Sequence, residues 1–250
     1  MSLDQPHRLL VLGYGSLLAA VAGFVNAVAI LVLAFPVGNL TATTTKLGMD
    51  VADPMLHEGS VLAFIILGFL IGAMIAGAAL SPADRHAGAR HSAVMSFEAF
   101  LLISAFMLTD NTVAVILAAI ACGMQNGTTS SLRAMQIRTT HFTGTLTDLG
   151  LLIGRSPQYG FDAWKGIVLS ATVVTFIGGG VAGTVAGSRI GDAALLIPAG
   201  ICIAVAVVGL GYDLWRTAYI RANQPTPSPR IGHADTEIGD DLVAVRHHAG

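Results

Sequence analysis

Six long apolar runs restrict what this chain can fold into. Each run is close to the roughly 20 residues that an α-helix needs to cross about 30 Å of hydrocarbon. Among the 13 basic and 15 acidic residues, Glu98 alone lies inside a run. Soluble core helices do not exclude charge repeatedly over this length, so the sequence predicts an all-α integral membrane protein with about six transmembrane helices. The runs are 9–34, 60–80, 92–109, 112–131, 166–188 and 193–212.

Composition and motifs argue against several other classes of protein. Charged residues make up 11% of the chain, whereas a soluble domain has about 25%. A net charge of −2 argues against a nucleic-acid partner. The sequence contains no phosphate-binding glycine loop, zinc-protease motif or serine-hydrolase motif, so we expect no enzyme activity, no cofactor and no metal site. Cys122 and Cys202 fall inside apolar runs and are expected to be small buried apolar residues.

The distribution of lysine and arginine predicts the orientation of the chain. With six spans, nine of these residues near span ends fall on one side of the membrane, and Lys46 and Arg189 fall on the other. Basic residues favour the cytoplasmic side, so both termini are expected in the cytoplasm. The segments 1–8 and 216–250 are then cytoplasmic tails, and the second is expected to be disordered. The nine residues are Arg8, Arg85, Arg90, Arg133, Arg138, Arg155, Lys165, Arg216 and Arg221.

Short motifs recur about 100 residues apart and divide the membrane body into two halves, 9–109 and 112–212. The tetrapeptide GFVN at 23–26 recurs as GMQN at 123–126, and a threonine-rich segment follows each copy. The next run in each half carries small residues at every fourth position, which lets helices approach closely. Three spans per half give the halves opposite orientations, so we expect an inverted repeat of the kind found in secondary transporters. The small residues are Gly68, Gly72 and Ala76 in one half and Gly179, Gly183 and Gly187 in the other.

The same motifs carry a family resemblance. The segment GMQNGTTSSLRAMQIRTTHFTGTLTDLGLLIGR at 123–155, with GFVNAVAI at 23–30 and GNLTATTTKLG at 38–48, resembles the YoaK-like family of uncharacterised bacterial multi-pass membrane proteins. The resemblance covers about 9–213 and implies a location in the bacterial cytoplasmic (inner) membrane, but no established activity. Asn26 stands where relatives commonly carry aspartate, and this departure argues against a proton-carrying role at that position.

The threonine-rich motifs predict short segments that return into the membrane. Gly38-Asn39 and Thr143-Gly144 each precede a stretch too short or too polar to cross by itself, and such a stretch can return only where protein or a wet cavity surrounds it. Asn39 or Thr41 in one copy, and Thr143 or Thr145 in the other, are expected N-cap residues. Two helix N-termini facing a central cavity would suit an anion. The cations expected to attract it are Lys46, Arg133, Arg138 and His141.

Several polar residues leave two interpretations open. Glu98 lies six residues into its predicted span, about 9 Å from the helix start, and is either an ion-coupling carboxyl or a group that reaches the interface and pairs with an arginine such as Arg90. Asn26, Gln125 and Asn126 either bind a solute or join helices to one another. The threonines and glycines of the motifs are either part of a binding site or ordinary helix-packing residues.

Taken together, the patterns favour a small secondary transporter or permease. It would bind a small polar solute, with anions among the candidates, between the two repeats within the lipid bilayer. A membrane-embedded enzyme, a lipid-handling protein and an accessory subunit of a membrane complex are the alternatives. A homodimer through the Gly68/Gly72 face or the Gly179/Gly183/Gly187 face is also expected. The candidate solute-binding residues are Asn26, Gly38, Asn39, Thr41, Gln125, Asn126, Thr143, Gly144 and Thr147.

Overall fold

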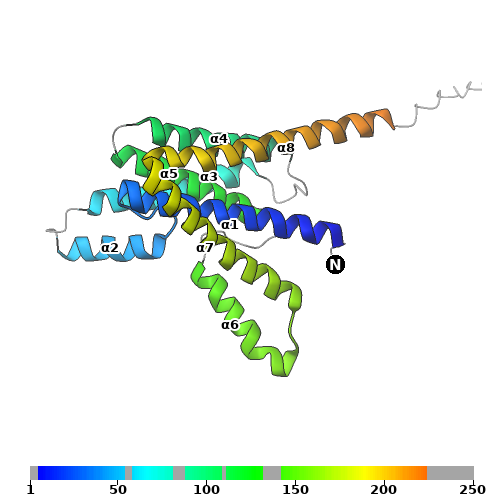
Figure 1. The fold of residues 1–250 in the computed structure, drawn as a ribbon, viewed down its shortest axis with the longest axis horizontal. Coiled ribbons are helices and arrows are strands. Elements are labelled where there is room, and N and C mark those ends of the chain that lie inside the picture. The colour runs from blue at the N-terminus through cyan, green and yellow to red at the C-terminus, as the bar shows by residue number, and fades with distance from the viewer. Residues whose placement is uncertain (1–4, 54–57, 81–87, 109–110, 132–141, 224–250) are drawn as a thin grey trace, which may run out of the picture.

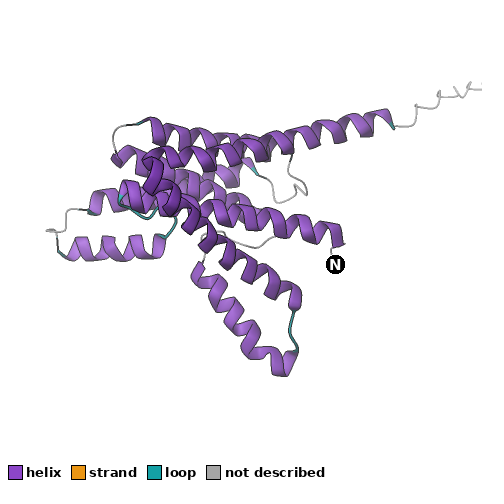
Figure 2. Cartoon of the chain, viewed as in Figure 1, coloured by secondary structure: helices purple, strands orange, loops and turns teal. Residues whose placement is uncertain are grey.

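The described part of the chain is helical, with short connections between helices. The computed structural model describes residues 5–53, 58–80, 88–108, 111–131 and 142–223, and it contains no strand within these ranges (Figures 1 and 2). The fold class predicted from the apolar runs is therefore confirmed as all-α. The helices are α1 (Gln5–Leu33), α2 (Leu40–Ala52), α3 (Gly59–Ala79), α4 (Ala89–Met107), α5 (Asn111–Ser131), α6 (Phe142–Tyr159), α7 (Ala163–Ile190), the 3₁₀-helix η2 (Gly191–Leu195) and α8 (Leu196–Ala222).

Four segments of the described chain are long and apolar enough to cross a membrane. Three of them correspond to α1, α3 and α5, and the fourth, Ala163–Ala222, contains α7, η2 and α8. These segments are those of a helical membrane protein. The six predicted spans would further require α4 to cross and the fourth segment to cross twice.

Two helix pairs make the most extensive contacts, and they connect opposite halves of the chain. α1 packs along α7, and α3 packs along α5. A side chain at Gly23 of α1 would collide with the backbone oxygen of Phe176 in α7, and a side chain at Gly123 of α5 would collide with that of Phe69 in α3. The glycines of the two repeated motifs therefore have the same role, which is to let two helix backbones touch.

The glycine stripes of α3 and α7 are occupied by these intramolecular contacts, which corrects their expected role in a homodimer. Gly68 and Gly72 are buried against α5, while Gly179, Gly183 and Gly187 are buried against α1. The spacing correctly indicated close helix contact, but the partner helix belongs to the same chain. These two faces are not free to bind a second copy.

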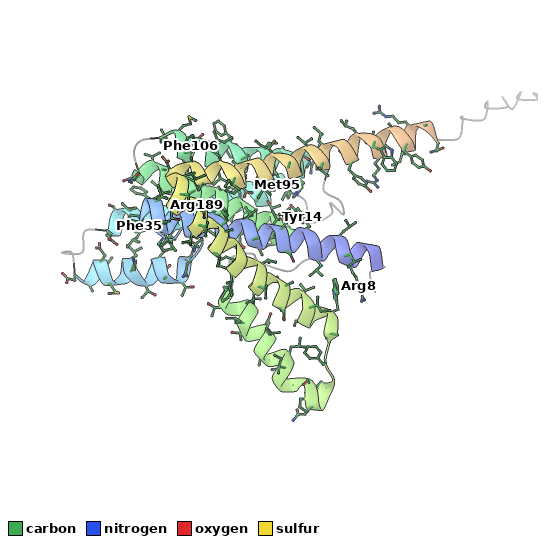
Figure 3. The ribbon with its side chains drawn as sticks, viewed as in Figure 1. Arg8, Tyr14, Phe35, Met95, Phe106 and Arg189 are labelled. Carbon is green, nitrogen blue, oxygen red and sulfur yellow. The ribbon has the colours of Figure 1, made fainter. Side chains whose placement is uncertain are left out.

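The ends of several helices can be assigned to the same end of the bundle. Arg8 lies over the ring of Trp164, 5.4 Å from its centroid, so α1 and α7 begin together. Tyr14 contacts His91, so α4 begins near the same end as α1. Figure 3 places Arg8 and Tyr14 toward one end of the bundle and Arg189, at the end of α7, toward the other.

The helices α4 and α8 pack against each other and run antiparallel. Glu98 of α4 meets Cys202 of α8, and nearer the start of α4 the Ala89 N–H donates to Asp213 Oδ2 at 3.3 Å. α8 then extends beyond the bundle (Figure 1).

The polar C-terminal segment begins later in the chain than expected. Residues 216–222 belong to α8, although the sequence suggested a disordered tail from 216. Trp215 stacks on Tyr219 with ring centroids 5.7 Å apart and meets Tyr212 at a tilt with centroids 6.1 Å apart, so neighbouring turns support one another through aromatic contact. Residues 224–250 lie outside the described part of the chain.

Candidate functional site

Asn26 holds the chain that returns after α1. Its Oδ1 accepts a hydrogen bond of 2.9 Å from the Gly38 backbone N–H. Since α1 continues to Leu33, residues 34–38 must double back along its last two turns. The chain then enters α2 with Asn39 as N-cap, whose Oδ1 accepts from the Ala42 N–H at 3.2 Å, as predicted. The first motif therefore places Asn26, Gly38 and Asn39 together, and the Asn26 carbonyl is engaged by the backbone.

α2 and α6 have the same pattern of burial although their sequences differ. Residues 40–52 and 142–154 show the same succession of buried, half-buried and exposed positions, with Thr43 and Thr145 as the buried members. Thr45 Oγ1 bonds to the Thr41 carbonyl, and a bond of the same 2.9 Å length recurs between Thr147 and Thr143 in α6. These hydroxyls donate to carbonyls of their own helices, and a role of Thr41, Thr143 and Thr147 in solute binding stays a prediction.

The N-cap prediction for the second motif is wrong. α6 begins at Phe142, so Thr143, Gly144 and Thr145 lie within its first turn rather than before it. The Phe142 ring packs on Phe176 of α7, with centroids 5.5 Å apart, so apolar contact anchors this helix start.

The cations predicted to attract an anion do not gather around a described cavity. Lys46 is exposed on α2, near a shallow surface depression lined by Leu40, Thr41, Thr44 and Thr45. Arg133, Arg138 and His141 lie outside the described residues. The predicted anion site remains a prediction.

Glu98 is buried at the middle of α4. α4 begins at Ala89, earlier than the sequence indicated, so Glu98 is its tenth residue and lies about 14 Å from the helix start. The side chain is 1% exposed and therefore does not reach the interface. The Cys202 thiol donates to its Oε1 at 3.5 Å, while its Oε2 has no hydrogen-bond partner among the described residues. The expectation of buried cysteines is confirmed, and Cys202 is in addition a donor to the carboxyl.

Tyr14, which is half-buried, and His91, which is buried, form a second polar contact, between α1 and α4. The Tyr14 hydroxyl lies 2.7 Å from His91 Nε2, and the two rings meet edge to face with centroids 5.6 Å apart. The same hydroxyl lies 4.0 Å from Met95 Sδ, on the helical turn between His91 and Glu98. Figure 3 shows Tyr14 and Met95 in the same half of the bundle.

Four buried polar atoms of the described chain have no hydrogen-bond partner, and all belong to α4 or α5. Leaving such a group unpaired costs about 1–3 kcal/mol each in a protein interior, and in a bilayer buried polar groups are typical of functional positions. We call Tyr14, His91, Ser92, Glu98, Gln125 and Cys202 the polar centre. The four atoms are His91 Nδ1, Ser92 Oγ, Glu98 Oε2 and Gln125 Nε2.

The two amides of the second motif occupy different environments. Gln125 is 1% exposed in α5, and Asn126 is half-buried beside it. Thr129 Oγ1 bonds to the backbone carbonyls of both residues, at 3.2 and 3.0 Å. Gln125 therefore offers a free donor to the protein interior, as a solute-binding residue would.

Sequence reasoning found Glu98 and Gln125 but missed Tyr14, His91 and Ser92. A signal was present, because positions 91, 92, 95 and 98 follow the spacing of one helix face. The predicted span began at 92, which left His91 in a loop and hid the pattern.

Comparison with known proteins gives one family. The model described as protein of unknown function (DUF1275) matches residues 14–208. No curated protein and no solved structure matches the chain.

Proposed function

The chain belongs to DUF1275, a family of proteins of unknown function, and we propose that this member is a small secondary transporter of the bacterial inner membrane. The observation that carries the proposal is the buried Glu98 carboxyl, which meets α8 of the second half and has one oxygen without a partner among the described residues. The resemblance of its motifs to YoaK-like proteins agrees with an uncharacterised multi-pass membrane family.

The packing supports an inverted repeat of α1–α4 and α5–α8. In such a repeat α1 corresponds to α5, and α3 corresponds to α7. The contact between α1 and α7 then has its counterpart in the contact between α5 and α3, so each half packs its first long helix against a helix of the other half. α4 and α8 would be equivalent helices, and they run antiparallel. An axis that relates antiparallel helices lies perpendicular to them, and therefore in the plane of the membrane.

The helix lengths and turns support six crossings. The 19 residues of α4 span about 28 Å, close to the thickness of the hydrocarbon. The chain reverses after α7 at Gly191, whose φ of 62° suits glycine. Arg8, Arg90 and Lys165 belong to the end at which α1, α4 and α7 begin, so we assign this end to the cytoplasm.

The contact between Asn26 and Gly38 supports a re-entrant segment before α2. Irregular backbone at membrane depth is tolerated only where protein or a wet cavity satisfies its polar groups. Gly38 is buried, and the Asn26 side chain satisfies its N–H.

The polar centre favours a neutral or cationic solute with hydrogen-bond donors. Glu98 Oε2 is an acceptor, and Gln125 Nε2 adds a donor for a carbonyl or hydroxyl. An anion would be repelled by the Glu98 carboxyl group in its ionised form. Of the four cations predicted to attract an anion, Lys46 is the one within the described residues, and it is exposed on α2. Small amino acids, amines and polyols are therefore the solutes to test first.

A thermal-shift screen of such solutes on the purified protein tests this function. A solute at about a hundred times its Kd should stabilise the protein by about 2.7 kcal/mol. Glu98→Gln should abolish the shift, while Ser96→Ala, an exposed position of the same helix, should keep it. Solutes that pass should exchange across proteoliposome membranes. A shift that survives Glu98→Gln, or the absence of exchange, would contradict the proposal, and a second subunit co-purifying in fixed ratio would favour an accessory role.

A further inference from the structure

The polar centre is distributed unevenly along the bundle. From Glu98 toward the start of α4, the buried residues of this helix are Met95, Val94, Ser92 and His91. From Glu98 toward the end of α4, they are Ala99, Leu101, Leu102 and Ala105. On α8 the buried residues on both sides of Cys202 are apolar, so the asymmetry belongs to α4. The buried polar side chains of α4 other than Glu98 therefore all lie between Glu98 and the start of the helix.

The polar side of the centre ends close to solvent. His91 is buried, with 3% of its surface exposed, but Ala89 and Arg90 immediately before it are exposed. Its Nδ1 has no hydrogen-bond partner among the described residues, while its Nε2 is joined to the Tyr14 hydroxyl. The imidazole thus has Nε2 joined to Tyr14 and an enclosed Nδ1, unpartnered in the described chain, that lies one residue from the exposed start of α4.

Tyr14 connects His91 with the region of Glu98. Its hydroxyl touches Met95, which lies one helical turn, about 5 Å, before Glu98. A bridging water extends a hydrogen-bond network between two such polar groups where they do not touch directly. The titratable groups facing Glu98 are Tyr14 from α1, Cys122 from α5 and Cys202 from α8.

We infer that the Tyr14–His91 pair is the route by which Glu98 exchanges a proton with the side of the membrane at which α4 begins. A proton leaving Glu98 binds the Tyr14 oxygen while the Tyr14 hydroxyl proton passes to His91 Nε2, and the Nδ1 proton of His91 passes to a water molecule that enters at the start of α4. One proton enters the Tyr14–His91 pair and one leaves it, so the charge of the pair does not change. As a coupling route for transport, the inference rests on the proposed function.

Infrared spectroscopy of the full-length protein in vesicles of phosphatidylethanolamine and phosphatidylglycerol tests the route. After transfer to D₂O, the carboxylic acid band that disappears in Glu98→Gln reports proton exchange at this residue. Tyr14→Phe and His91→Gln should each slow its exchange about a hundredfold, the order by which a positioned acid or base accelerates proton transfer. His91→Gln keeps an acceptor for the Tyr14 hydroxyl, and Tyr212→Phe, at an exposed tyrosine of α8, is the control that should not change the rate.

Unchanged exchange in either Tyr14→Phe or His91→Gln would overturn the route, as would the absence of any carboxylic acid band that depends on Glu98. Equal slowing in Tyr212→Phe would also overturn it, because the effect would then not depend on the pair. The measurement uses no solute. If the two variants slow the exchange but no solute is transported, the route holds and the proposed transport function fails. The two failures can therefore be told apart.

Discussion

Replacing Gly183 by alanine tests the close contact between α1 and α7. Gly183 is buried, and a Cβ atom at this position would lie 2.6 Å from the backbone oxygen of Phe24. Ordinary van der Waals contact begins at 3.4 Å, so the two helices would have to separate by about 0.8 Å. The obstructing oxygen belongs to a helix backbone and cannot rotate away. Relief must therefore come from movement of a whole helix.

The expected loss of stability follows from this forced separation. Overpacking of a well-packed interior costs about 1–3 kcal/mol. Gly178→Ala is the matched control, because it lies on the same helix and nothing comes within 4 Å of its added Cβ. Both variants gain similar helix propensity, about 1 kcal/mol, which cancels in their difference. A cost of about 2 kcal/mol corresponds to roughly 4–8 °C in the unfolding midpoint of a chain of this size.

Thermal unfolding of the two purified variants in the same detergent, followed by far-UV circular dichroism, measures this difference. We expect Gly183→Ala to unfold several degrees below Gly178→Ala. Equal midpoints would refute the reasoning, because α1 and α7 would then tolerate the added methyl group without cost.

Three further predictions concern the returning chain, the orientation and the carboxyl. Asn26→Leu should lower the free energy of unfolding by about 1–3 kcal/mol, because it leaves the buried Gly38 N–H unpaired, whereas Asn26→Asp retains the acceptor. Chemical denaturation measures both variants, and equal losses of stability would contradict the contact between Asn26 and Gly38. Val51→Cys should react with a membrane-impermeant maleimide in intact cells, and Arg216→Cys should react only after permeabilisation. Both native cysteines are buried, so they should add little background labelling. Labelling of both introduced cysteines from one side would exclude the proposed orientation of the chain in the membrane. Cys202→Ser should keep the stability measured by thermal unfolding because a hydroxyl still donates to Glu98, while Cys202→Ala should lower it by about 1–2 kcal/mol; a Cys202→Ser variant as unstable as Cys202→Ala would argue against that hydrogen bond.

Hydropathy was sufficient to predict the six long apolar helices, because exclusion of charge acts on every residue of a long segment. In contrast, α2 and α6 lie outside the apolar runs and were indicated by the threonine-rich motifs. The predicted runs differ from the observed helices by only a few residues at most ends. The main exception is α8, which continues to Ala222 through a segment whose aromatic residues stack along the helix. A local hydropathy average does not contain such side-chain contacts.

The partners of each helix were harder to predict than the helices. Glycine at every fourth position indicates that a backbone comes close, but a spacing within one helix does not identify the other helix. The stripe at Gly179 and Gly183 could equally have faced a second copy, and it faces α1 instead. The partner of His91 was hidden in the same way, since its contact with Tyr14 joins residues 77 positions apart.

The exchange of helices between halves has a consequence for how the chain is made. α1 leaves the ribosome long before α7, the helix against which Gly23 and Ala20 pack. During synthesis its glycine face must therefore remain in lipid, or beside an insertion factor, until nearly the whole membrane body has been translated. A first half released alone would contain α1 without α7 and α3 without α5. Membrane insertion and folding are thus separate events in this protein, and the second waits for the arrival of the last helices.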